Sequence, residues 1–567
     1  MKGALTSVLA VIGALLAAEA GTVYDIVIYG STPAALSAAV QAKRMRKRAV
    51  VVSPEKRIGG LMTGGLGQTD IGNKKAFGGL ALEFYAAVAD YYRRDENWKW
   101  QSRRDYLTES GDMQSSMWKF EPHAALAILE GWEKRDGLEI VRDEWLDRAS
   151  VVIKRDGRIE SIVTMSGKVY RGKMFIDATY EGDLMAAAGV PYFVGREGND
   201  VYGESLNGVQ IANATGHQLE SGISPYIATD DPAAGLLPGV EPYDPNEKDG
   251  DGDSRVPAYC YRMCLTDVDG NRIPFRKPAN YKAIDYELLI RNLVAQERNH
   301  PEWAGSDTLG IPWIKSQMPN RKTDTNNRGG FSTDFVGNSR EWAEASYAER
   351  DRIAREHLAY QQGLMWALAN DPRVPDRIRN VVSRWGTCRD EFVGERGDGW
   401  QNQLYVRETR RMVGAYVMTE DHCWGKVRAP HPIAKGAYQM DSHNVRRFVG
   451  KDGFVHNEGD VQKGWNVLTG NPYGVDYGSI VPKRGDCANL MAPVCLSASH
   501  IAFGSIRMEP VFFALGQAAA TAAILSIDAD VAVQDVDYQI LSTRLRADGQ
   551  VFCWSRDGVL CAEEKGS

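Results

Sequence analysis

The stretch from Tyr24 to Gly60 constrains the fold of this chain more than any other part of its sequence. It begins with the run from Asp25 to Tyr29, which is apolar and rich in β-branched residues, as is typical of a buried parallel strand. Gly30 ends the run, and Pro33 follows in a position that suits the first turn of a helix. A second apolar run, Ala49 to Val52, comes next. Strand, tight turn, helix and strand in this order predict a dinucleotide-binding βαβ unit, with a pyrophosphate at the helix N-terminus.

The turn of this unit departs from the G-x-G-x-x-G fingerprint. It reads Gly30-Ser31-Thr32-Pro33-Ala34-Ala35, and alanine at the last position is an accepted variant. Thr32, however, places a side chain where backbone is expected to approach phosphate. The acidic residue expected on a ribose is also displaced, because the second strand ends in Ser53 and Glu55 comes two residues later. The motif alone therefore leaves open a βαβ unit without a nucleotide.

A glycine-rich segment after the second strand favours FAD over NAD. It contains Gly59-Gly60-Leu61 and then Gly65, and such glycines let backbone approach the pyrophosphate and ribityl chain of a cofactor. Polar residues follow at Thr69-Asp70, and we expect them to face a ligand. No second fingerprint occurs in the sequence, so an NAD(P)H domain of the usual kind is not expected.

Several long segments resemble one known family. They include GGLMTGGLGQTDIGNKKAFGGLALEFY, FIDATYEGDLMAAAGV and the segment from Val481 to Ala523. The chain resembles the FAD-dependent oxidoreductases of the glutathione-reductase-like type, a bacterial and fungal group of which some members are labelled "xanthan lyase". The resemblance runs from residue 24 to residue 525. It implies FAD as the cofactor, places Asp177 to Asp183 beside it, and leaves the oxidised substrate open.

Five regions are expected to hold the cofactor: the first turn, the end of the second strand, the glycine-rich segment, and two later places in segments that carry the resemblance. The expected cofactor-binding residues are Gly30, Ser31, Thr32, Pro33, Ala34, Ala35, Ser53, Glu55, Gly59, Gly60, Leu61, Gly65, Asp177, Ala178, Thr179, Met508 and Glu509.

The expected fold class is α/β. A Rossmann-type FAD-binding domain has a parallel sheet and a β-meander over residues 149–174, and a mixed α+β substrate domain interrupts it. The expected divisions are a signal peptide at 1–20, the FAD-binding domain at 21–190 and 431–530, the substrate domain at 191–430, and a C-terminal segment at 531–567 without assignment.

Apolar patterns predict further elements. Residues 258–265 and 489–494 read as strands, and residues 285–296 and 340–368 read as helices. A long helix is expected at 511–527, opened by Met508-Glu509-Pro510. Its positive end would lie near the pyrimidine ring of the flavin and favour uptake of a hydride.

The N-terminus reads as a secretory signal peptide. Lys2 is followed by an apolar run from Leu5 to Ala18, and Ala18-Glu19-Ala20 is an A-x-A cleavage site. A short membrane anchor is the alternative, but the run is too short to span a bilayer comfortably. We therefore expect a secreted or periplasmic protein with no membrane partner after cleavage. The net charge of -7 argues against nucleic acid as a partner.

Cysteines and acidic residues give weaker signals. The chain has eight cysteines and no C-x-x-C motif, so dithiol chemistry is not expected. Cys553 and Cys561 are the best candidates for a disulfide in an exported protein. The acidic segment from Asp244 to Ser254 lacks the glutamate that closes a calcium loop, so we expect a solvated turn and no metal.

Oxidation of an alcohol or amine requires a base as well as the flavin. His443 and His500 lie in polar, small-residue segments near the C-terminus, and we expect at least one of them to be catalytic. His123 is expected to be structural. Arg507 is expected to steer a polar substrate or hold the flavin, and an internal ion pair with Glu509 is the alternative.

A basic strip is formed by Tyr405, Arg407, Arg410 and Arg411. Their spacing predicts one face of a helix, which would either pair with acidic neighbours such as Glu408 or anchor a hydroxyl-rich or anionic substrate.

Three functions remain open from the sequence. The first is a secreted FAD-dependent oxidoreductase that oxidises a sugar, a polyol or a related small metabolite, with oxygen or another electron acceptor. The second is a polysaccharide lyase, which needs a base but no flavin. The third is a non-catalytic binding protein with a flavin-binding fold. Bound flavin in the purified protein separates the first from the others, while the oligomeric state is left open.

Overall fold

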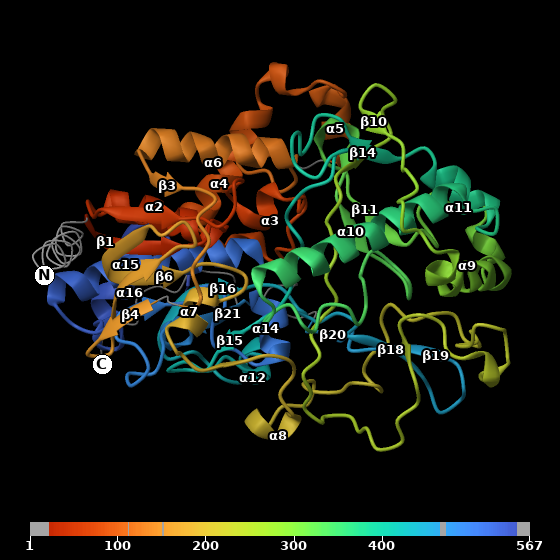
Figure 1. Cartoon of the computed structure of the whole chain (residues 1–567). Coiled ribbons are helices and arrows are strands. Elements are labelled where there is room, and N and C mark those ends of the chain that lie inside the picture. The colour runs from red at the N-terminus through yellow and green to blue at the C-terminus, as the bar shows by residue number, and fades with distance from the viewer. Residues whose placement is uncertain (1–21, 111–112, 150–151, 465–471, 553–567) are drawn as a thin grey trace, which may run out of the picture.

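A computed structural model of the chain describes residues 22–110, 113–149, 152–464 and 472–552 (Figure 1). The predicted signal peptide and both Cys553 and Cys561 lie outside these ranges. The N-terminal segments in red and orange and the C-terminal segments in dark blue lie together on the left of Figure 1, and the green middle of the chain lies on the right. The two ends of the chain therefore lie together, and the middle of the chain forms the part on the right.

The largest sheet has seven strands. They are β1 (Val23–Tyr29), β2 (Ala49–Val52), β3 (Glu139–Val141), β4 (Val152–Arg155), β5 (Arg158–Val163), β6 (Val169–Asp177) and β22 (Leu490–Met491). Their order is β3-β2-β1-β6-β5-β4, with β22 beside the end of β6. The strands β3, β2, β1, β6 and β22 are parallel, and β4, β5 and β6 form an antiparallel meander. The predicted α/β fold class, with a parallel sheet and a β-meander, is confirmed.

Most of the helices around this sheet belong to the two ends of the chain. They are α2 (Pro33–Arg44), α3 (Gly60–Thr63), α4 (Gly79–Tyr92), α5 (Arg103–Ser110), α6 (Pro122–Asp136), α7 (Asp183–Ala187), α14 (His500–Ile506), α15 (Glu509–Ala529) and α16 (Tyr538–Ala547). Within the described ranges, α15 alone is long and apolar enough to cross a membrane, and it is buried as a core helix.

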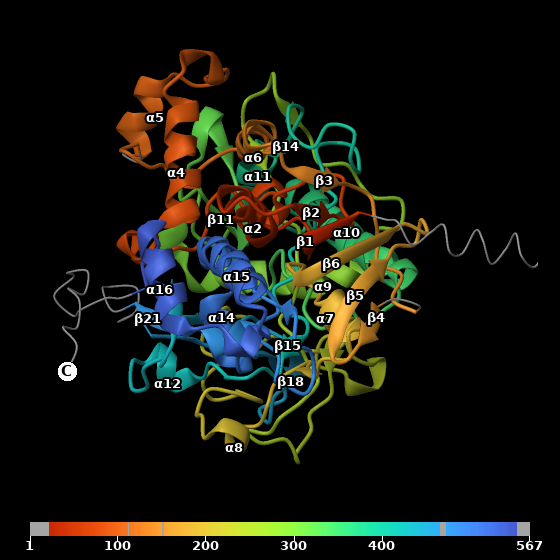
Figure 2. The same ribbon diagram turned by 90° about the vertical axis from the view of Figure 1, so that its left-hand side faces the viewer.

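Strand β1 is buried on both faces, which explains its continuous apolar run. Ile26 and Ile28 belong to the main core together with the alanines of α2, whereas Val27 and Tyr29 belong to a second core that includes Leu184 of α7. Helix α15 packs against α2 on the face of the sheet that carries Ile26 and Ile28 (Figure 2). Gly516 permits this packing, because a Cβ there would lie 2.1 Å from the carbonyl oxygen of Ala34.

The middle of the chain contains five helices in the described ranges: α8 (Asn199–Tyr202), α9 (Glu287–Asn299), α10 (Tyr347–Asn370), α11 (Asp376–Val382) and α12 (Glu420–Cys423). The predicted helices at 285–296 and 340–368 correspond to α9 and α10. Helix α10 begins later than predicted because Ser346 and Glu349 form a capping box at its start.

The remaining strands are short and form small sheets. They are β7 (Tyr192–Phe193), β8 (Val240–Glu241), β9 (Leu265–Thr266), β10 (Arg272–Ile273), β11 (Trp313–Lys315), β12 (Lys322–Thr323), β13 (Thr325–Asn327), β14 (Gly386–Cys388), β15 (Arg411–Met412), β16 (Pro432–Gly436), β17 (Met440–Asp441), β18 (Arg446–Val449), β19 (Val455–Glu458), β20 (Gln462–Lys463) and β21 (Tyr473–Asp476).

The predicted strand at 258–265 is wrong except at its last residue. The segment is buried, but its backbone bonds to side chains and loops rather than to a ladder: the amide of Tyr261 donates to Gln361 Oε1, and Ala258 donates to the carbonyl of Asn444. Tertiary packing, rather than a sheet, explains its apolar character. The expected domain boundaries at residues 190 and 430 stay predictions.

Two of the weaker sequence signals can be followed in the structure. Six cysteines in the described ranges are unbridged, and the Sγ atoms of Cys264 and Cys388 lie 3.8 Å apart. In the acidic segment 244–254, Asp249 accepts hydrogen bonds from the backbone of Ile211 and Ala212, and Asp253 pairs with Arg196. These two carboxylates are engaged by protein donors.

Candidate active site

The turn between β1 and α2 is built tightly against the end of β6. Gly30 has a φ of +111°, and a Cβ there would lie 2.6 Å from the carbonyl oxygen of Ala178, so only glycine fits. The hydroxyl of Thr32 donates a hydrogen bond of 2.7 Å to the same oxygen. The Thr32 side chain is thus held against β6, which accounts for a side chain at this position of the fingerprint.

The start of α2 meets the residues expected at a dinucleotide site. Thr32 is the N-cap but makes no side-chain bond into the helix, and Pro33 is its first residue. The amide of Gly59 donates to the carbonyl of Ser31 at 2.7 Å, so the second glycine segment lies beside the first turn. An uncapped helix start between two glycine-bearing turns fits a pyrophosphate, because the amides and the helix dipole favour a negative charge.

Glu55 lies just beyond β2 and keeps a free carboxylate. Ser53 fixes this turn, since its hydroxyl donates to the carbonyl of Glu55 and accepts from the Glu55 amide. The Glu55 side chain is half-buried. Burial, reinforced by Glu181 and Glu395, raises the pKa of Glu55 to about 7. A half-buried carboxylate of this kind fits ribose hydroxyls as partners.

The end of β6 is organised by Asp177. Its carboxylate accepts hydrogen bonds from the amide and hydroxyl of Thr179 and from the amide of Met185. Burial raises the pKa of Asp177 to about 6. Asp183 pairs with Arg350 and Arg410. Both carboxylates therefore stabilise the turn, and the contact of this segment with a cofactor stays a prediction.

Tyr180 links three distant segments beside α3. Its hydroxyl donates to Glu509 Oε1 at 2.8 Å and accepts from the Leu61 amide at 3.0 Å. Burial raises the pKa of Glu509 to about 8, although the bond from Tyr180 acts in the opposite direction. In the described part of the chain, Glu509 Oε2 has no hydrogen-bond partner. The start of α15 thus reaches the glycine segment, while its expected position beside the flavin stays a prediction.

The junction between α14 and α15 joins this region to a second polar cluster. Arg507 caps the C-terminus of α14, and Met508 is the N-cap of α15. Arg507 donates to the hydroxyl of Tyr405 at 3.0 Å and lies 3.2 Å from Asp441 Oδ2. Its partner is therefore Asp441 rather than Glu509, which answers the alternative left open by the sequence.

His443 lies in the same cluster. Its Nδ1 is 2.9 Å from Asp334 Oδ2, and its Nε2 is 3.6 Å from Asp441 Oδ2. Arg407 lies 2.9 Å from the other oxygen of Asp334. Burial opposes ionisation of Asp334, but Arg407 and His443 hold its pKa far below the ordinary value. The Asp334 carboxylate thus orients the imidazole and leaves Nε2 toward Asp441.

The loop after α3 brings Asp70 to this cluster. The amide of Gln68 donates to Asp324, which pairs with Arg262. Burial raises the pKa of Asp70, with Arg262 acting against this shift. The side chains of Asp70 and Tyr438 are half-buried and lie in contact with each other. Thr69 is buried and its hydroxyl is bonded to that of Tyr85, so the expectation that this segment faces a ligand stays a prediction for Asp70 alone.

Sequence reasoning missed Arg262, Asp334 and Tyr438 as members of the cluster. Arg262 lies in AYCYRMCLTD, a segment shared with the family, but no role was expected for it, and no motif included Asp334. Tyr438 comes shortly before the segment that contains His443, and its nearness to that histidine was the only available signal. From the sequence, only the histidines and the basic strip were expected in this region. The structure adds carboxylates from distant loops to the cluster.

His500 belongs to a separate, closed network. Its Nδ1 is 2.9 Å from Glu408 Oε2, and its amide donates to Glu197. Arg411 pairs with both of these acids. Each charge in this group has a partner within the protein, so the contacts of His500 are those of a structural histidine. His443, by contrast, lies in the cluster that contains Arg507.

The helical face predicted for Tyr405, Arg407, Arg410 and Arg411 is wrong. This segment is not helical, and β15 begins at Arg411. Each arginine is buried and pairs with a different acid: Arg407 with Asp334, Arg410 with Asp183, and Arg411 with Glu197. Burial against distant acids overrides the helical spacing.

His123 lies in a compact charged group. It contacts Glu391 at 2.7 Å, and the ammonium of Lys322 lies 2.8 Å from both Glu391 and Glu121. These carboxylates and His123 are close enough to hold a metal ion, but the lysine already supplies the positive charge. The prediction that His123 is structural agrees with these contacts.

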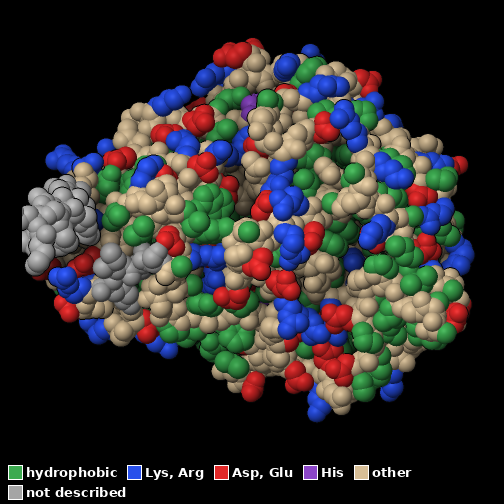
Figure 3. All heavy atoms as spheres, viewed as in Figure 1, with side chains coloured by type: hydrophobic (Ala, Val, Ile, Leu, Met, Phe, Trp, Pro, Cys, Tyr) green, Lys and Arg blue, Asp and Glu red, His purple; other side chains and the backbone are tan. Residues whose placement is uncertain are grey.

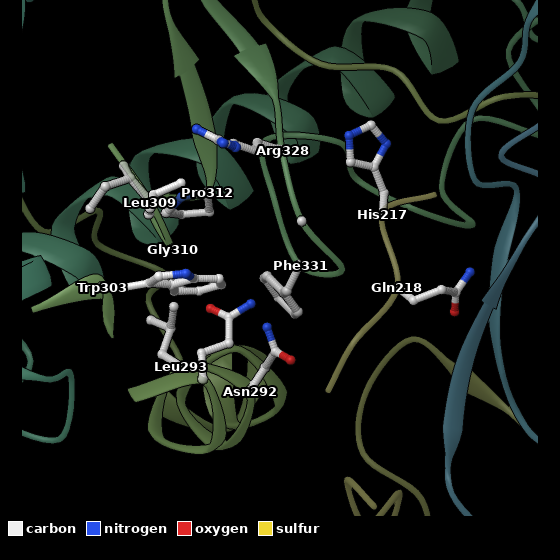
Figure 4. A pocket seen from close by; sticks show the side chains of 13 residues that line it. His217, Gln218, Asn292, Leu293, Trp303, Leu309, Gly310, Pro312, Arg328 and Phe331 are labelled. Carbon is white, nitrogen blue, oxygen red and sulfur yellow. The ribbon is translucent and has the colours of Figure 1, made fainter. Parts of the chain in front are cut away.

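The surface offers two openings near these groups. In the space-filling view the molecule is hollowed near α3 (Figure 3). A pocket of about 240 Å³ opens on the middle part, with Trp303, Phe331 and Arg328 on its walls and His217 at its edge (Figure 4). His217 pairs with Asp460 at 2.7 Å, and this pair raises the pKa of His217 although burial acts against it.

The parallel sheet, the uncapped α2 start and the glycine turns define a dinucleotide-binding flavoprotein. The chain belongs to the family of FAD dependent oxidoreductases, whose sequence profile matches residues 25–545. The residues described above fit the cofactor: an uncapped helix start for its pyrophosphate, Glu55 for its ribose, and the start of α15 for its flavin. FAD is therefore the cofactor of this protein.

Solved structures similar to this chain include several flavin enzymes. They include a variant of the flavin monooxygenase from Stenotrophomonas maltophilia, with 16% identity, 34% of this chain and 46% of that chain covered, and a TM-score of 0.20. Bacillithiol disulfide reductase Bdr from Staphylococcus aureus has 15% identity, 32% and 44% coverage, and a TM-score of 0.18. The p-nitrophenol 4-monooxygenase PnpA from Pseudomonas putida has 16% identity, 31% and 44% coverage, and a TM-score of 0.21.

The matched part spans less than half of each of these three enzymes. No curated protein matches the chain. The family and the cofactor are thus established by the match along residues 25–545, while the substrate must be argued from the site itself.

Proposed function

We propose that this FAD-dependent oxidoreductase is exported and oxidises a small polar substrate, such as a sugar, a polyol or a related hydroxyl-bearing metabolite. Oxygen or another diffusible acceptor would reoxidise the flavin. Export rests on the sequence from Lys2 to Ala20 alone. The substrate class rests on the polar cluster beside the cofactor site.

The observation that carries the proposal is the position of Arg507. It lies two residues before Glu509, which is tied to Leu61 of α3 through Tyr180. Its own guanidinium contacts Tyr405 and Asp441. One short junction thus joins the cofactor-binding turns to a buried group of ionisable side chains. A substrate between them would meet hydroxyl, carboxylate, guanidinium and imidazole groups, which suit hydroxyl-bearing molecules.

We assign the cofactor to the β1–α2 turn, Glu55 and the α3 segment. Bound FAD supplies the acceptor for a hydride. The amides at the start of α2 would bind the pyrophosphate, and Glu55 would accept hydrogen bonds from the ribose. Glu509, with a pKa of about 8, is largely protonated near neutral pH and is therefore a potential hydrogen-bond donor through Oε2 toward the flavin.

We assign the base to His443. Asp334 fixes Nδ1 of the imidazole, and Nε2 faces Asp441 at 3.6 Å, so a substrate hydroxyl that enters between Nε2 and Asp441 would give its proton to Nε2. The positive charges of Arg407 and Arg507 nearby would stabilise a developing alkoxide. Tyr405, held by Arg507, would orient the same substrate. His500 remains the second candidate, and its closed network makes it the control.

The two other hypotheses gain no support. A polysaccharide lyase needs no flavin, whereas the family match and the dinucleotide site both concern FAD. A non-catalytic binding protein would not need an oriented histidine beside the cofactor site.

The proposal is tested by anaerobic mixing of the FAD-loaded protein with sugars, polyols, hydroxy acids and amines. We expect at least one hydroxyl-bearing compound to bleach the visible absorbance of the flavin. If only amines bleach it, or if no compound does, the proposed substrate class is wrong.

A further inference from the structure

A second pocket adjoins the pocket of Figure 4. It has a volume of about 300 Å³ and shares one wall, Phe331, with that pocket. Five aromatic residues line it: Tyr281, Tyr286, Phe331, Phe335 and Tyr360. Phe335 stacks on Tyr360 with ring centroids 4.2 Å apart, and Tyr286 lies nearly parallel to Tyr360 at 6.2 Å. The pocket thus offers flat apolar surfaces that suit a ring.

Arg447 of β18 lines the same pocket. It is only 4% exposed, and its guanidinium lies over the ring of Phe331, 4.5 Å from the centroid. Its hydrogen bond to the carbonyl of Gly330 is long, 3.4 Å, and its guanidinium also contacts the hydroxyl of Tyr360. Among the described residues, its Nε has no hydrogen-bond partner. Across the described ranges, no carboxylate forms an ion pair with it.

Two other buried arginines nearby, unlike Arg447, form ion pairs with carboxylates. Arg446, the preceding residue, pairs with Glu247 and Glu458. Arg407 pairs with Asp334. Asp334 is the acid that attracts Arg447 through space, but it already holds Arg407 and His443. The charge of Arg447 is therefore left without a dedicated counter-charge.

A buried cation without a partner is costly. Burial lowers the pKa of Arg447, and the attraction of Tyr360 and Asp334 offsets this only in part. Buried charges in proteins are normally paired, because the interior solvates an isolated ion poorly. A ligand that brings an anionic group into the pocket would supply the missing charge.

The other charges around the pocket lie toward the surface and are of mixed sign. Lys282 is exposed, and Glu356 is exposed and pairs with Arg352. Burial raises the pKa of Asp285, so this carboxylate is less firmly ionised. At depth, Arg447 is the charged group that lines the pocket.

We propose that this pocket binds a monocyclic aromatic carboxylate. The carboxylate pairs with Arg447, and the ring lies among Tyr286, Phe335 and Tyr360. Arginine suits a planar carboxylate because its guanidinium offers two parallel donors. The pocket is lined by none of the residues assigned above to the substrate or the cofactor, and its ligand is detected by binding without turnover.

Calorimetric titration of the FAD-loaded protein tests the proposal. Benzoate is the probe, and benzamide is its neutral isostere. We expect benzoate to bind the wild type at least about 10-fold more tightly than benzamide, because a charge-assisted pair is formed. Arg447→Gln should remove this preference. Lys282→Gln, which removes a rim charge, should change benzoate affinity by less than about 3-fold because exposed charges interact weakly.

A second variant tests the pocket without replacing Arg447. Ala359 lines the pocket from α10, and Ala359→Trp should block benzoate while the guanidinium stays in place. Retained flavin absorbance shows that both variants are folded. The proposal is overturned if benzoate fails to bind, if benzamide binds equally well, or if Ala359→Trp leaves benzoate affinity unchanged.

Discussion

The hydroxyl of Tyr180 donates a hydrogen bond of 2.8 Å to Glu509 and accepts one of 3.0 Å from the amide of Leu61. One side chain after β6 therefore joins the glycine segment at α3 to the first turn of α15, although the three segments are far apart in the sequence. This link holds the N-terminal and C-terminal parts of the chain together at the proposed cofactor site. The middle part separates them in the sequence.

Glu509 should make the stability of the protein depend on pH. Its pKa is raised from 4.5 to about 8 in the folded protein by burial. The folded state therefore holds a proton that the unfolded state has lost, and the free energy of unfolding falls as pH rises from about 4.5 to about 8. The slope is about 1.4 kcal/mol per pH unit. Glu509→Gln should lack this contribution.

Urea unfolding at several pH values measures this effect. The difference between Glu509→Gln and the wild type isolates Glu509 from other titrating groups. We expect the variant to gain stability relative to the wild type with rising pH and to level off above pH 8. Parallel pH profiles for the two proteins would show that Glu509 does not titrate in this range.

Gly30→Ala should abolish FAD retention. The turn has a φ of +111° and no room for a Cβ against the carbonyl of Ala178. Gly157→Ala is a matched control, because Gly157 also has a positive φ, +73°, but a Cβ there would meet nothing within 4 Å. The ratio of flavin to protein absorbance after purification measures retention. Full retention in Gly30→Ala would remove the turn from the cofactor site.

Thr32→Val should destabilise the protein by about 1–3 kcal/mol, because the carbonyl of Ala178 would lose a buried hydrogen bond. Thr32→Ser keeps the hydroxyl and should lie close to the wild type. Urea unfolding of both variants measures the difference. Glycine at this position should likewise weaken the protein, since it also lacks the hydroxyl. Equal stability of the valine and serine variants would mean that the bond contributes little.

Glu55 should make FAD affinity rise with pH. Its pKa of about 7 results from burial together with Glu181 and Glu395. Ribose hydroxyls are bound best by the ionised carboxylate, so FAD binds more tightly as pH increases through 7. Glu55→Gln should bind FAD with no such dependence, as measured by titrating FAD into flavin-free protein from pH 6 to pH 8. An unchanged pH dependence in the variant would exclude Glu55 as the ribose partner.

The sequence predicted the sheet well because its signals are local. The β-branched runs at Asp25–Tyr29 and Ala49–Val52 lie in β1 and β2, and the glycine at Gly30 marks the turn. The predicted strand at 258–265 failed because burial there comes from packing against distant loops. Apolar patterns report burial, and they do not distinguish a ladder from an extended buried segment.

The site was predicted less completely because it depends on long-range pairs. The link from Tyr180 to Glu509 and the pair of His443 with Asp334 join residues that no spacing rule connects. The helical reading of Arg407 and Arg411 failed for the same reason, since each is fixed by a distant acid. Local motifs located the cofactor turns, whereas the acids that orient the histidines required the fold.

The rate of flavin reduction in His443→Asn tests the central claim most directly, namely that the cluster around His443 and Arg507 is where the substrate gives up its proton and hydride. It is measured by anaerobic stopped flow with a compound that bleaches the wild-type flavin. We expect His443→Asn to retain FAD and to slow reduction by roughly 10²–10⁴-fold, because a general base contributes a factor of this size. His500→Asn, the control, should reduce its flavin at nearly the wild-type rate. Wild-type reduction in His443→Asn, or a loss of rate confined to His500→Asn, would contradict the account.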